Sequence, residues 1–246
     1  MVRRVLNLGH RGASHDAPQN TLAAFRLANA YGADGYELDA QLSKDGALVV
    51  IHDFTVDKTT DGSGRVSSFT LDELKRLDAG SKFCPEFAGE RIPTLAEVFD
   101  VRQAHTIVNI ELKTASPRDS GLEDATIRLV RERKLEDRVI VSSFNPFSLL
   151  RVRRRAPELR IGLLYAPDLP LYLRRAWFRF VLRPDALHPR YQMVNARYME
   201  WAQKRGCDVN VWTVDDPEDM KRLAGLGVNA IITNRPDVAR DALVGG

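Results

Sequence analysis

The sequence is poor in cysteine, has no long apolar run and carries almost balanced charge. Its two cysteines, Cys84 and Cys207, lie in no C-x-x-C spacing and beside no histidine pair, which argues against a zinc site and indicates free thiols in a reducing compartment. The N-terminal apolar run is too short for a signal peptide or a membrane span. The formal net charge of +3, from 36 basic and 33 acidic residues, is too small to indicate a nucleic-acid partner. These absences predict a cytoplasmic protein with a small-molecule partner, and they indicate no oligomeric state.

The pattern of apolar residues predicts one α/β domain. At 246 residues and 44% hydrophobic composition the chain can bury one sizeable core, and its length is close to the roughly 250 residues of a (β/α)8 barrel. Short β-branched runs alternate with segments of helical periodicity, which is typical of βαβ units. Eight candidate strands favour a closed TIM-type barrel over an open sheet. They are Val5–Leu8, Gly35–Leu42, Ile107–Leu112, Val139–Ser142, Ile161–Leu164, Ala186–Leu187, Val209–Thr213 and Ala230–Thr233.

Helices are predicted between these strands, with one interruption. Asn20 and the Asp216–Pro217 pair have the residue types that start helices. In Leu48–Arg91 an apolar run is followed by polar sequence and a short helix, so we expect a small insertion after the second barrel strand, at about residues 53–91 of a single domain spanning 1–246. The predicted helices are Thr21–Tyr31, Leu71–Leu77, Leu95–Gln103, Ala125–Lys134, Phe147–Ala156, Ala196–Lys204 and Pro217–Leu226.

Polar residues close four of the apolar runs, at the strand ends where barrel enzymes place reactive groups. They are His10 with Arg11, Glu37 with Asp39, His52 with Asp53, and Glu111 with Lys113. Residues two apart on a strand share a face, so Glu37, Asp39 and Glu111 converge if that face is the barrel interior. A single carboxylate would be read as a surface ion pair, but three together need a cation, and all-oxygen ligands suit Mg²⁺ or Ca²⁺. The pairing of His10 with His52 favours an acid/base role for both.

A longer set of short motifs runs in one order from residue 10 to residue 236. The motifs include His10-Arg-Gly-Ala-Ser, Pro18-Gln-Asn-Thr, Gly32-Ala-Asp-Gly-Tyr-Glu-Leu-Asp39, Val49-Val-Ile-His-Asp53, Ile92-Pro-Thr-Leu95, Asn109-Ile-Glu-Leu-Lys113, Ser143-Phe144 and Val211-Trp-Thr-Val214. Each motif is weak alone, but the ordered set resembles the glycerophosphodiester phosphodiesterase family, of the bacterial, cytoplasmic type.

The resemblance implies a reaction and a set of roles. The reaction is the metal-dependent hydrolysis of glycerophosphodiesters to glycerol 3-phosphate and an alcohol. The resemblance gives acid/base catalysis to His10 and His52, Mg²⁺ or Ca²⁺ binding to Glu37, Asp39 and Glu111, phosphate contacts to Arg11 and Lys113, and a wall for the glycerol moiety to Trp212 and Phe144. For the two aromatic residues a place in the core is an equally good interpretation.

The sequence departs from the family pattern at two positions. Gln19 stands where the family usually has glutamate, and Asn234 stands where an aspartate is common. Neither departure removes a proposed ligand or base. His188 follows the sixth predicted strand, where we expect it to pack in the structure rather than reach the site.

Two alternative functions stay open. A lysophospholipase D-like activity would need an apolar groove, to which Trp177 and Phe178 could contribute. The basic amphipathic stretch Leu169–Arg183 could lie on an anionic membrane, but a barrel helix with a solvated arginine face is favoured. A non-catalytic phosphate-binding barrel is the second alternative, and it is disfavoured because binding alone does not require two histidines.

Overall fold

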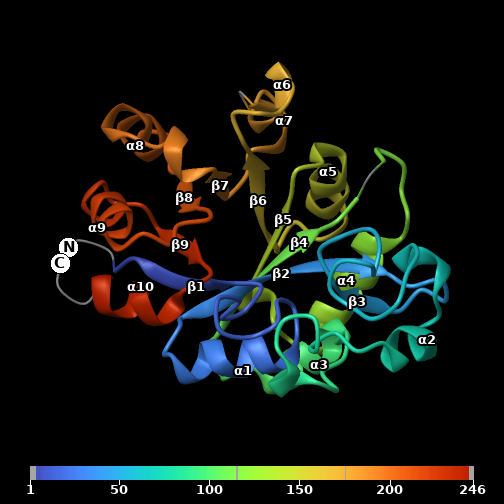
Figure 1. Ribbon diagram of the computed structural model, residues 1–246. Helices are drawn as coiled ribbons and strands as arrows, with labels where there is room; N and C mark the ends of the chain where they lie inside the picture. The colour runs from blue at the N-terminus through green and yellow to red at the C-terminus, as the bar shows by residue number, and fades with distance from the viewer. Residues whose placement is uncertain (1–3, 115, 175, 244–246) are drawn as a thin grey trace.

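Eight parallel strands form a closed ring in the computed structural model, which describes residues 4–114, 116–174 and 176–243 (Figure 1). The ring closes because the first strand pairs with both the second and the last. All eight predicted strands are present, so the TIM-type barrel is confirmed. The barrel strands are β1 (Leu6–His10), β2 (Gly35–Leu42), β4 (Ile107–Leu112), β5 (Val139–Ser143), β6 (Arg160–Tyr165), β7 (Ala186–Pro189), β8 (Asp208–Val211) and β9 (Ala230–Thr233).

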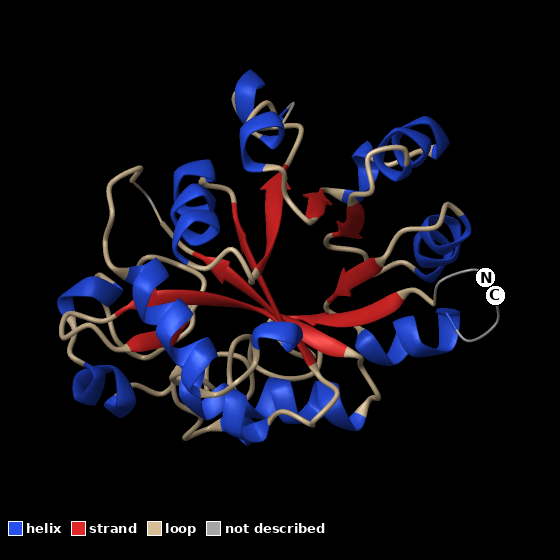
Figure 2. Cartoon of the chain, turned by 180° about the vertical axis from the view of Figure 1, so that it is seen from behind, coloured by secondary structure: helices blue, strands red, loops and turns tan. Residues whose placement is uncertain are grey.

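Helices surround the ring on its outer side (Figure 2). Because both faces of each strand are covered, the strands are buried almost throughout, as in the fully buried β5. The ring of Phe25 on the first helix packs on Tyr36 of β2 with centroids 4.7 Å apart. The helices are α1 (Leu22–Ala30), α2 (Leu71–Arg76), α3 (Leu95–Val101), α4 (Leu122–Glu132), α5 (Pro146–Arg155), α6 (Leu171–Arg174), α7 (Arg179–Leu182), α8 (Ala196–Gln203), α9 (Pro217–Gly225) and α10 (Pro236–Leu243), with 3₁₀ turns at Val66–Ser68, Pro85–Phe87, Glu136–Arg138 and Tyr191–Met193.

Helix α1 begins differently from the prediction. Its N-cap is Thr21, whose hydroxyl accepts a hydrogen bond from the amide of Ala24 at 3.3 Å. Asn20 has a positive φ of 58°, and its side chain donates to Asp39 Oδ2 at 2.9 Å. The prediction that Asn20 starts the helix was wrong because a buried carboxylate takes its amide. Asp216 does cap α9, as predicted.

The stretch Leu169–Arg183 also corrects a prediction. It forms the two four-residue helices α6 and α7 instead of one amphipathic helix. Ala176, with a φ of 48°, interrupts the helical backbone between them. Arg175 lies outside the described residues. Among those that are described, no helix is both long and apolar enough to cross a bilayer.

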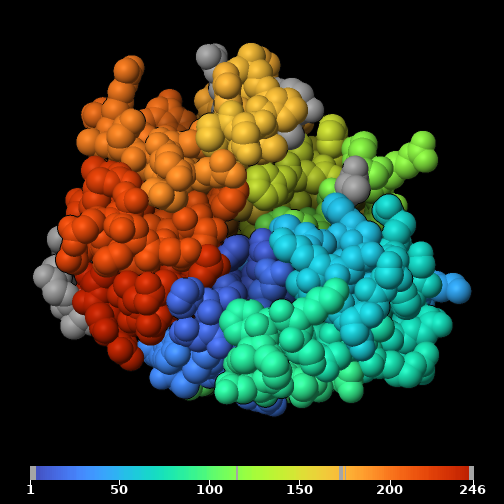
Figure 3. Space-filling model, in the orientation of Figure 1, coloured from blue at the N-terminus to red at the C-terminus, as the bar shows by residue number. Residues whose placement is uncertain are grey.

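A ninth strand, β3 (Leu48–Val50), runs antiparallel to the end of β2 and returns the chain to the mouth of the barrel. It is the apolar run that precedes the predicted insertion. This strand and the segment after it form a small apolar cluster. It contains Val49, Ile51, Val56, Val66, Leu74, Ala79 and Ile92. In Figure 3 this segment, cyan to green, lies beside the blue N-terminal residues at the hollowed centre of the view.

Candidate active site

The strand register sets polar side chains in two rows at the carboxyl ends of β1, β2 and β4. In the first row His10 is paired with Glu37, and Glu37 with Asn109. In the second row Asp39 is paired with Glu111. Since Glu37 and Asp39 are two residues apart, as are Asn109 and Glu111, both rows point to the same side of the sheet, the barrel interior. The register therefore brings these five side chains together.

Glu37, Asp39 and Glu111 form a compact carboxylate cluster. One oxygen of each lies within 4.8 Å of the others, and all three residues are buried. Burial, and then the charges of Asp39 and Glu111, raises the pKa of Glu37 well above its usual value. Burial followed by the charge of Asp39 raises the pKa of Glu111 to about 7. The cluster thus holds more negative charge than its surroundings compensate.

Two cations face this cluster. Arg11 Nε lies 3.2 Å from Asp39 Oδ2, and Lys113 Nζ lies 2.8 Å from Glu111 Oε1. Burial would raise the pKa of Asp39, but Arg11 and Lys113 outweigh it and the pKa is lowered. Three carboxylates against two fixed cations leave one negative charge in excess. Asp39 Oδ1 is buried and accepts no hydrogen bond, and Lys113 Nζ lies 3.6 Å from it.

His10 is held by a chain of two side chains from the loops that follow β9 and β8. Its Nδ1 lies 2.6 Å from Asn234 Oδ1, and Asn234 Nδ2 donates to Asp215 Oδ2 at 2.7 Å. Because the NH2 group of Asn234 donates to Asp215, the amide oxygen of Asn234 must accept from His10. The ring proton of His10 is therefore on Nδ1, and Nε2 carries the lone pair. Burial, and then Arg11, lowers the pKa of His10 to about 4, so the ring is neutral at pH 7.

His52 reaches the site through the β2–β3 hairpin. The amide of Ile51 donates to the carbonyl of Asp39 at 2.9 Å, which fixes the next residue beside the carboxylate cluster. Gln41 Nε2 donates to the carbonyls of Ile51 and Asp53, both at 2.8 Å. His52 Nδ1 lies 2.7 Å from Asp53 Oδ1, which again leaves Nε2 available. Burial is the main cause that lowers the pKa of His52.

An inner pocket opens inside the barrel mouth. Its polar lining is His10, Arg11, Glu37, His52, Asn109 and Glu111, and its apolar lining is Phe144, Leu164, Trp212 and Ile232. Phe144 and Trp212 meet edge to face, with ring centroids 5.5 Å apart. Trp212 Nε1 donates to the carbonyl of His188 at 2.8 Å, which orients the indole. The two predicted aromatic residues therefore lie together and border the pocket.

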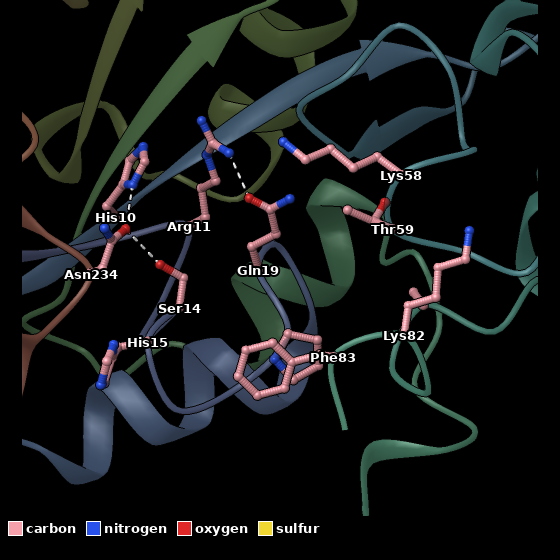
Figure 4. Close-up of a pocket in the computed structure, with 12 residues that line it drawn as sticks. His10, Arg11, Ser14, His15, Gln19, Lys58, Thr59, Lys82, Phe83 and Asn234 are labelled. Atoms are coloured by element: carbon pink, nitrogen blue, oxygen red, sulfur yellow. Dashed lines mark hydrogen bonds between the residues drawn. The ribbon is translucent and has the colours of Figure 1, made fainter. Parts of the chain in front are cut away.

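An outer pocket of 470 Å³ lies between the loop after β1 and the insertion (Figure 4). It shares His10 and Arg11 with the inner pocket. Its remaining lining residues are Ser14, His15, Pro18, Gln19, Lys58, Thr59, Ala79, Lys82, Phe83 and Asn234.

Comparison with known proteins shows the family of the chain. Residues 10–238 match the model of the glycerophosphoryl diester phosphodiesterase family. The chain belongs to that family. It is 48% identical over 237 residues to a glycerophosphodiester phosphodiesterase of Caldanaerobacter subterraneus subsp. tengcongensis, with 95% of this chain and 96% of the relative covered.

Solved structures of the family have the same fold. A phosphodiesterase of Oleispira antarctica, in complex with the product sn-glycerol-3-phosphate, superposes with a TM-score of 0.89 at 30% identity and covers 98% of each chain. A glycerophosphodiester phosphodiesterase of Agrobacterium tumefaciens superposes with a TM-score of 0.82 at 31% identity, with 97% of this chain and 99% of that chain covered. As a member of the glycerophosphoryl diester phosphodiesterase family, the chain is a phosphoric diester hydrolase.

The two departures from the family pattern have visible consequences. Gln19 accepts a hydrogen bond from Arg11 Nη1 at 2.5 Å through a neutral oxygen. Asn234 stands behind His10, so a neutral amide fills the place where a carboxylate would favour a charged ring.

Sequence reasoning missed several residues that shape the site. Asn109 is buried in the inner pocket, and neither atom of its amide group has a hydrogen-bond partner. Its position two residues before Glu111 on one strand was the available signal. Asn20 binds Asp39, and Asp53 binds His52; the sequence marked both residues but did not indicate these contacts. His188 is buried and lies 3.0 Å from Asn210 through its Nε2, in agreement with the packing role expected for it.

Proposed function

We propose that this phosphodiesterase hydrolyses glycerophosphodiesters to glycerol 3-phosphate and an alcohol, with a divalent cation on the carboxylate cluster and with His10 and His52 as the acid/base pair. The observation that carries the proposal is a buried trio of carboxylates with one uncompensated charge, next to two imidazoles whose Nε2 atoms are available. The substrate class is supported by the names of the relatives and by the glycerol phosphate bound in the Oleispira antarctica structure.

The donor set fits a hard cation. Glu37, Asp39 and Glu111 offer only oxygen atoms, which Mg²⁺ and Ca²⁺ prefer, and Asp39 Oδ1 accepts no hydrogen bond. The raised pKa values of Glu37 and Glu111 indicate that the site lacks positive charge. When bound, such a cation neutralises charge that builds up on the phosphoryl group.

The chain's own residues would bind and orient the substrate. Arg11 and Lys113 contact the phosphate oxygens, since a guanidinium matches two oxygens and an ammonium supplies a point charge. Phe144 and Trp212 offer an apolar wall to the glycerol carbons. A substrate hydroxyl beside the phosphate attacks phosphorus while one histidine takes its proton and the other protonates the leaving alcohol. Water then opens the cyclic phosphate to glycerol 3-phosphate.

The alternative functions are less well supported. Trp177 and Phe178 are not among the residues that line the inner or the outer pocket, so they offer no groove for an acyl chain beside His10. A barrel that only binds phosphate would not need two imidazoles beside the carboxylate cluster.

We further propose that the barrel and the insertion at 53–91 act as one domain in the cytoplasm. Insertion residues line the outer pocket beside Arg11, so the site needs both parts. Cys84 and Cys207 are free thiols, which a reducing compartment preserves.

A metal-dependence assay tests the proposed function. Hydrolysis of glycerophosphocholine should stop in excess chelator and return with Mg²⁺ or Ca²⁺. His10→Ala should lower kcat by about 10²- to 10⁴-fold, because proton transfer in the transition state is lost. His105→Ala, at an exposed histidine, is the matched control and should keep full activity. Activity that persists in chelator or in His10→Ala would contradict the proposal.

A further inference from the structure

The two pockets divide the substrate between them. His10 and Arg11 border both, so a phosphodiester held at these residues has one ester arm in each pocket. The inner pocket offers Phe144 and Trp212 to the carbon skeleton of glycerol. The leaving alcohol therefore occupies the outer pocket.

The outer pocket has a cationic lining. Arg11, Lys58 and Lys82 border it, and no aspartate or glutamate stands among its lining residues in the described part of the chain. Lys82 Nζ donates to the backbone carbonyl of Asp57 at 2.5 Å, which positions the ammonium without neutralising it. Lys58 has no hydrogen-bond or ion-pair partner among the residues that the structure describes, and Figure 4 shows its side chain extending toward Arg11 and Gln19.

The polar side chains nearest the two lysines have other hydrogen-bond partners. Asp57 accepts hydrogen bonds from Ser63 Oγ at 2.6 Å and from the amide of Gly64 at 3.0 Å. Asp16 Oδ1 lies 4.0 Å from His15 Nε2 rather than beside either lysine. Gln19 presents a neutral amide. Arg11 is paired with Asp39, whereas neither Lys58 nor Lys82 forms an ion pair with a carboxylate in the part of the chain that the structure describes.

We propose that the outer pocket selects glycerophosphodiesters whose alcohol carries a further negative charge, such as a phosphate monoester, over those whose alcohol carries a quaternary ammonium. This inference rests on the proposed function and names its preferred substrate class. Lysine ammonium groups bind phosphate as point charges. A quaternary ammonium is recognised by several aromatic faces, whereas Phe83 is the one Phe, Tyr or Trp ring among the described lining residues.

Two substrates that differ only in one phosphate provide the test. The kcat/KM for glycerophosphoinositol 4-phosphate should exceed that for glycerophosphoinositol by about tenfold, because a dianion lies beside two ammonium groups in a partly solvated pocket. The ratio should fall as NaCl is added, since salt screens exposed charges. In Lys58→Glu the ratio should drop to one or below. Lys44→Glu makes the same charge change at an exposed lysine outside the pocket and should keep the wild-type ratio.

The outcomes separate this inference from the proposed function. Hydrolysis of both substrates with equal kcat/KM, or an unchanged ratio in Lys58→Glu, overturns the specificity and leaves the hydrolase activity standing. Failure to hydrolyse either substrate or glycerophosphocholine, with Mg²⁺ or Ca²⁺ present, overturns the proposed function itself.

Discussion

Two clusters of buried charge, one at the barrel mouth and one between α4 and α5, differ in how they are compensated. Between the helices, the fully buried Glu123 accepts hydrogen bonds from Arg151 Nη2 at 2.7 Å and Nε at 3.1 Å, and it also binds Ser148. One carboxylate there meets one guanidinium. At the mouth three carboxylates meet two fixed cations, and two of the three carboxyl groups have raised pKa values. The balanced cluster joins two helices, whereas repulsion within the unbalanced one lowers stability.

The largest effect should come from removing one charge at the mouth. Glu37→Gln keeps the side-chain shape and should lower kcat on glycerophosphocholine by about a thousandfold. It weakens the binding of the proposed cation, whose stabilisation of the transition state is worth several kcal/mol. In chelator its melting temperature should equal or exceed that of the wild type, since the repulsion that raises the pKa of Glu37 is gone. A clear loss of stability together with retained activity would contradict the contrast between the charge cluster at the mouth and the one between α4 and α5.

The balanced cluster should respond in the opposite way. Arg151→Met leaves Glu123 buried without its partner and should destabilise the fold by about 3 kcal/mol, measured by urea unfolding. The kcat of the folded enzyme should not change, because the cluster is not part of the candidate site. The double variant with Glu123→Gln should recover part of the loss. A loss below about 1 kcal/mol would show that Glu123 does not depend on this ion pair.

The buried His188 should have a smaller effect, a dependence of the free energy of unfolding on pH. Burial, and then Arg160, lowers the pKa of His188 to about 3 in the folded protein, against about 6.5 unfolded. As the pH falls below 6.5, His188 becomes protonated in the unfolded chain but stays neutral in the folded protein. Protonation therefore favours unfolding, and the free energy of unfolding falls between pH 6.5 and pH 3. Between pH 7 and pH 5 the loss is about 2 kcal/mol.

His188→Gln should remove that loss. Urea unfolding at pH 7 and pH 5 gives the difference for the wild type and the variant, and His105→Gln at an exposed position is the control. Equal acid sensitivity of His188→Gln and the wild type would mean that His188 is not the group that titrates.

The polar rows at the mouth were predictable because strand alternation is a local rule. A spacing of two residues places Glu37 with Asp39, and the barrel brings Glu111 to the neighbouring strand. The direction of β3 was not predictable, since nothing in Leu48–Val50 specifies pairing with the far end of β2. Asn20 and Thr21 are both residue types that cap helices. Thr21 is the cap because the side chain of Asn20 is hydrogen-bonded to Asp39, which the sequence does not indicate.

Residues brought in by long loops escaped prediction for a related reason. Lys58 and Lys82 lie in the insertion, where no periodicity indicates which side chains face the site. The break between α6 and α7 depends on the backbone of Ala176, a residue type that usually favours helices. Helix α10 was not predicted, although its first residue, Pro236, is a common helix start.

The β2–β3 hairpin holds both ends of the insertion at one place on the barrel. The chain leaves β3 beside Asp39 and returns to the same strand, where the amide of Val50 donates to the carbonyl of Pro93 at 2.8 Å and Val49 bridges Thr94. Both ends of the excursion are thus fastened next to each other, and His52 is placed before it begins. The insertion residues that line the outer pocket can therefore change while His52 keeps its place beside Asp39.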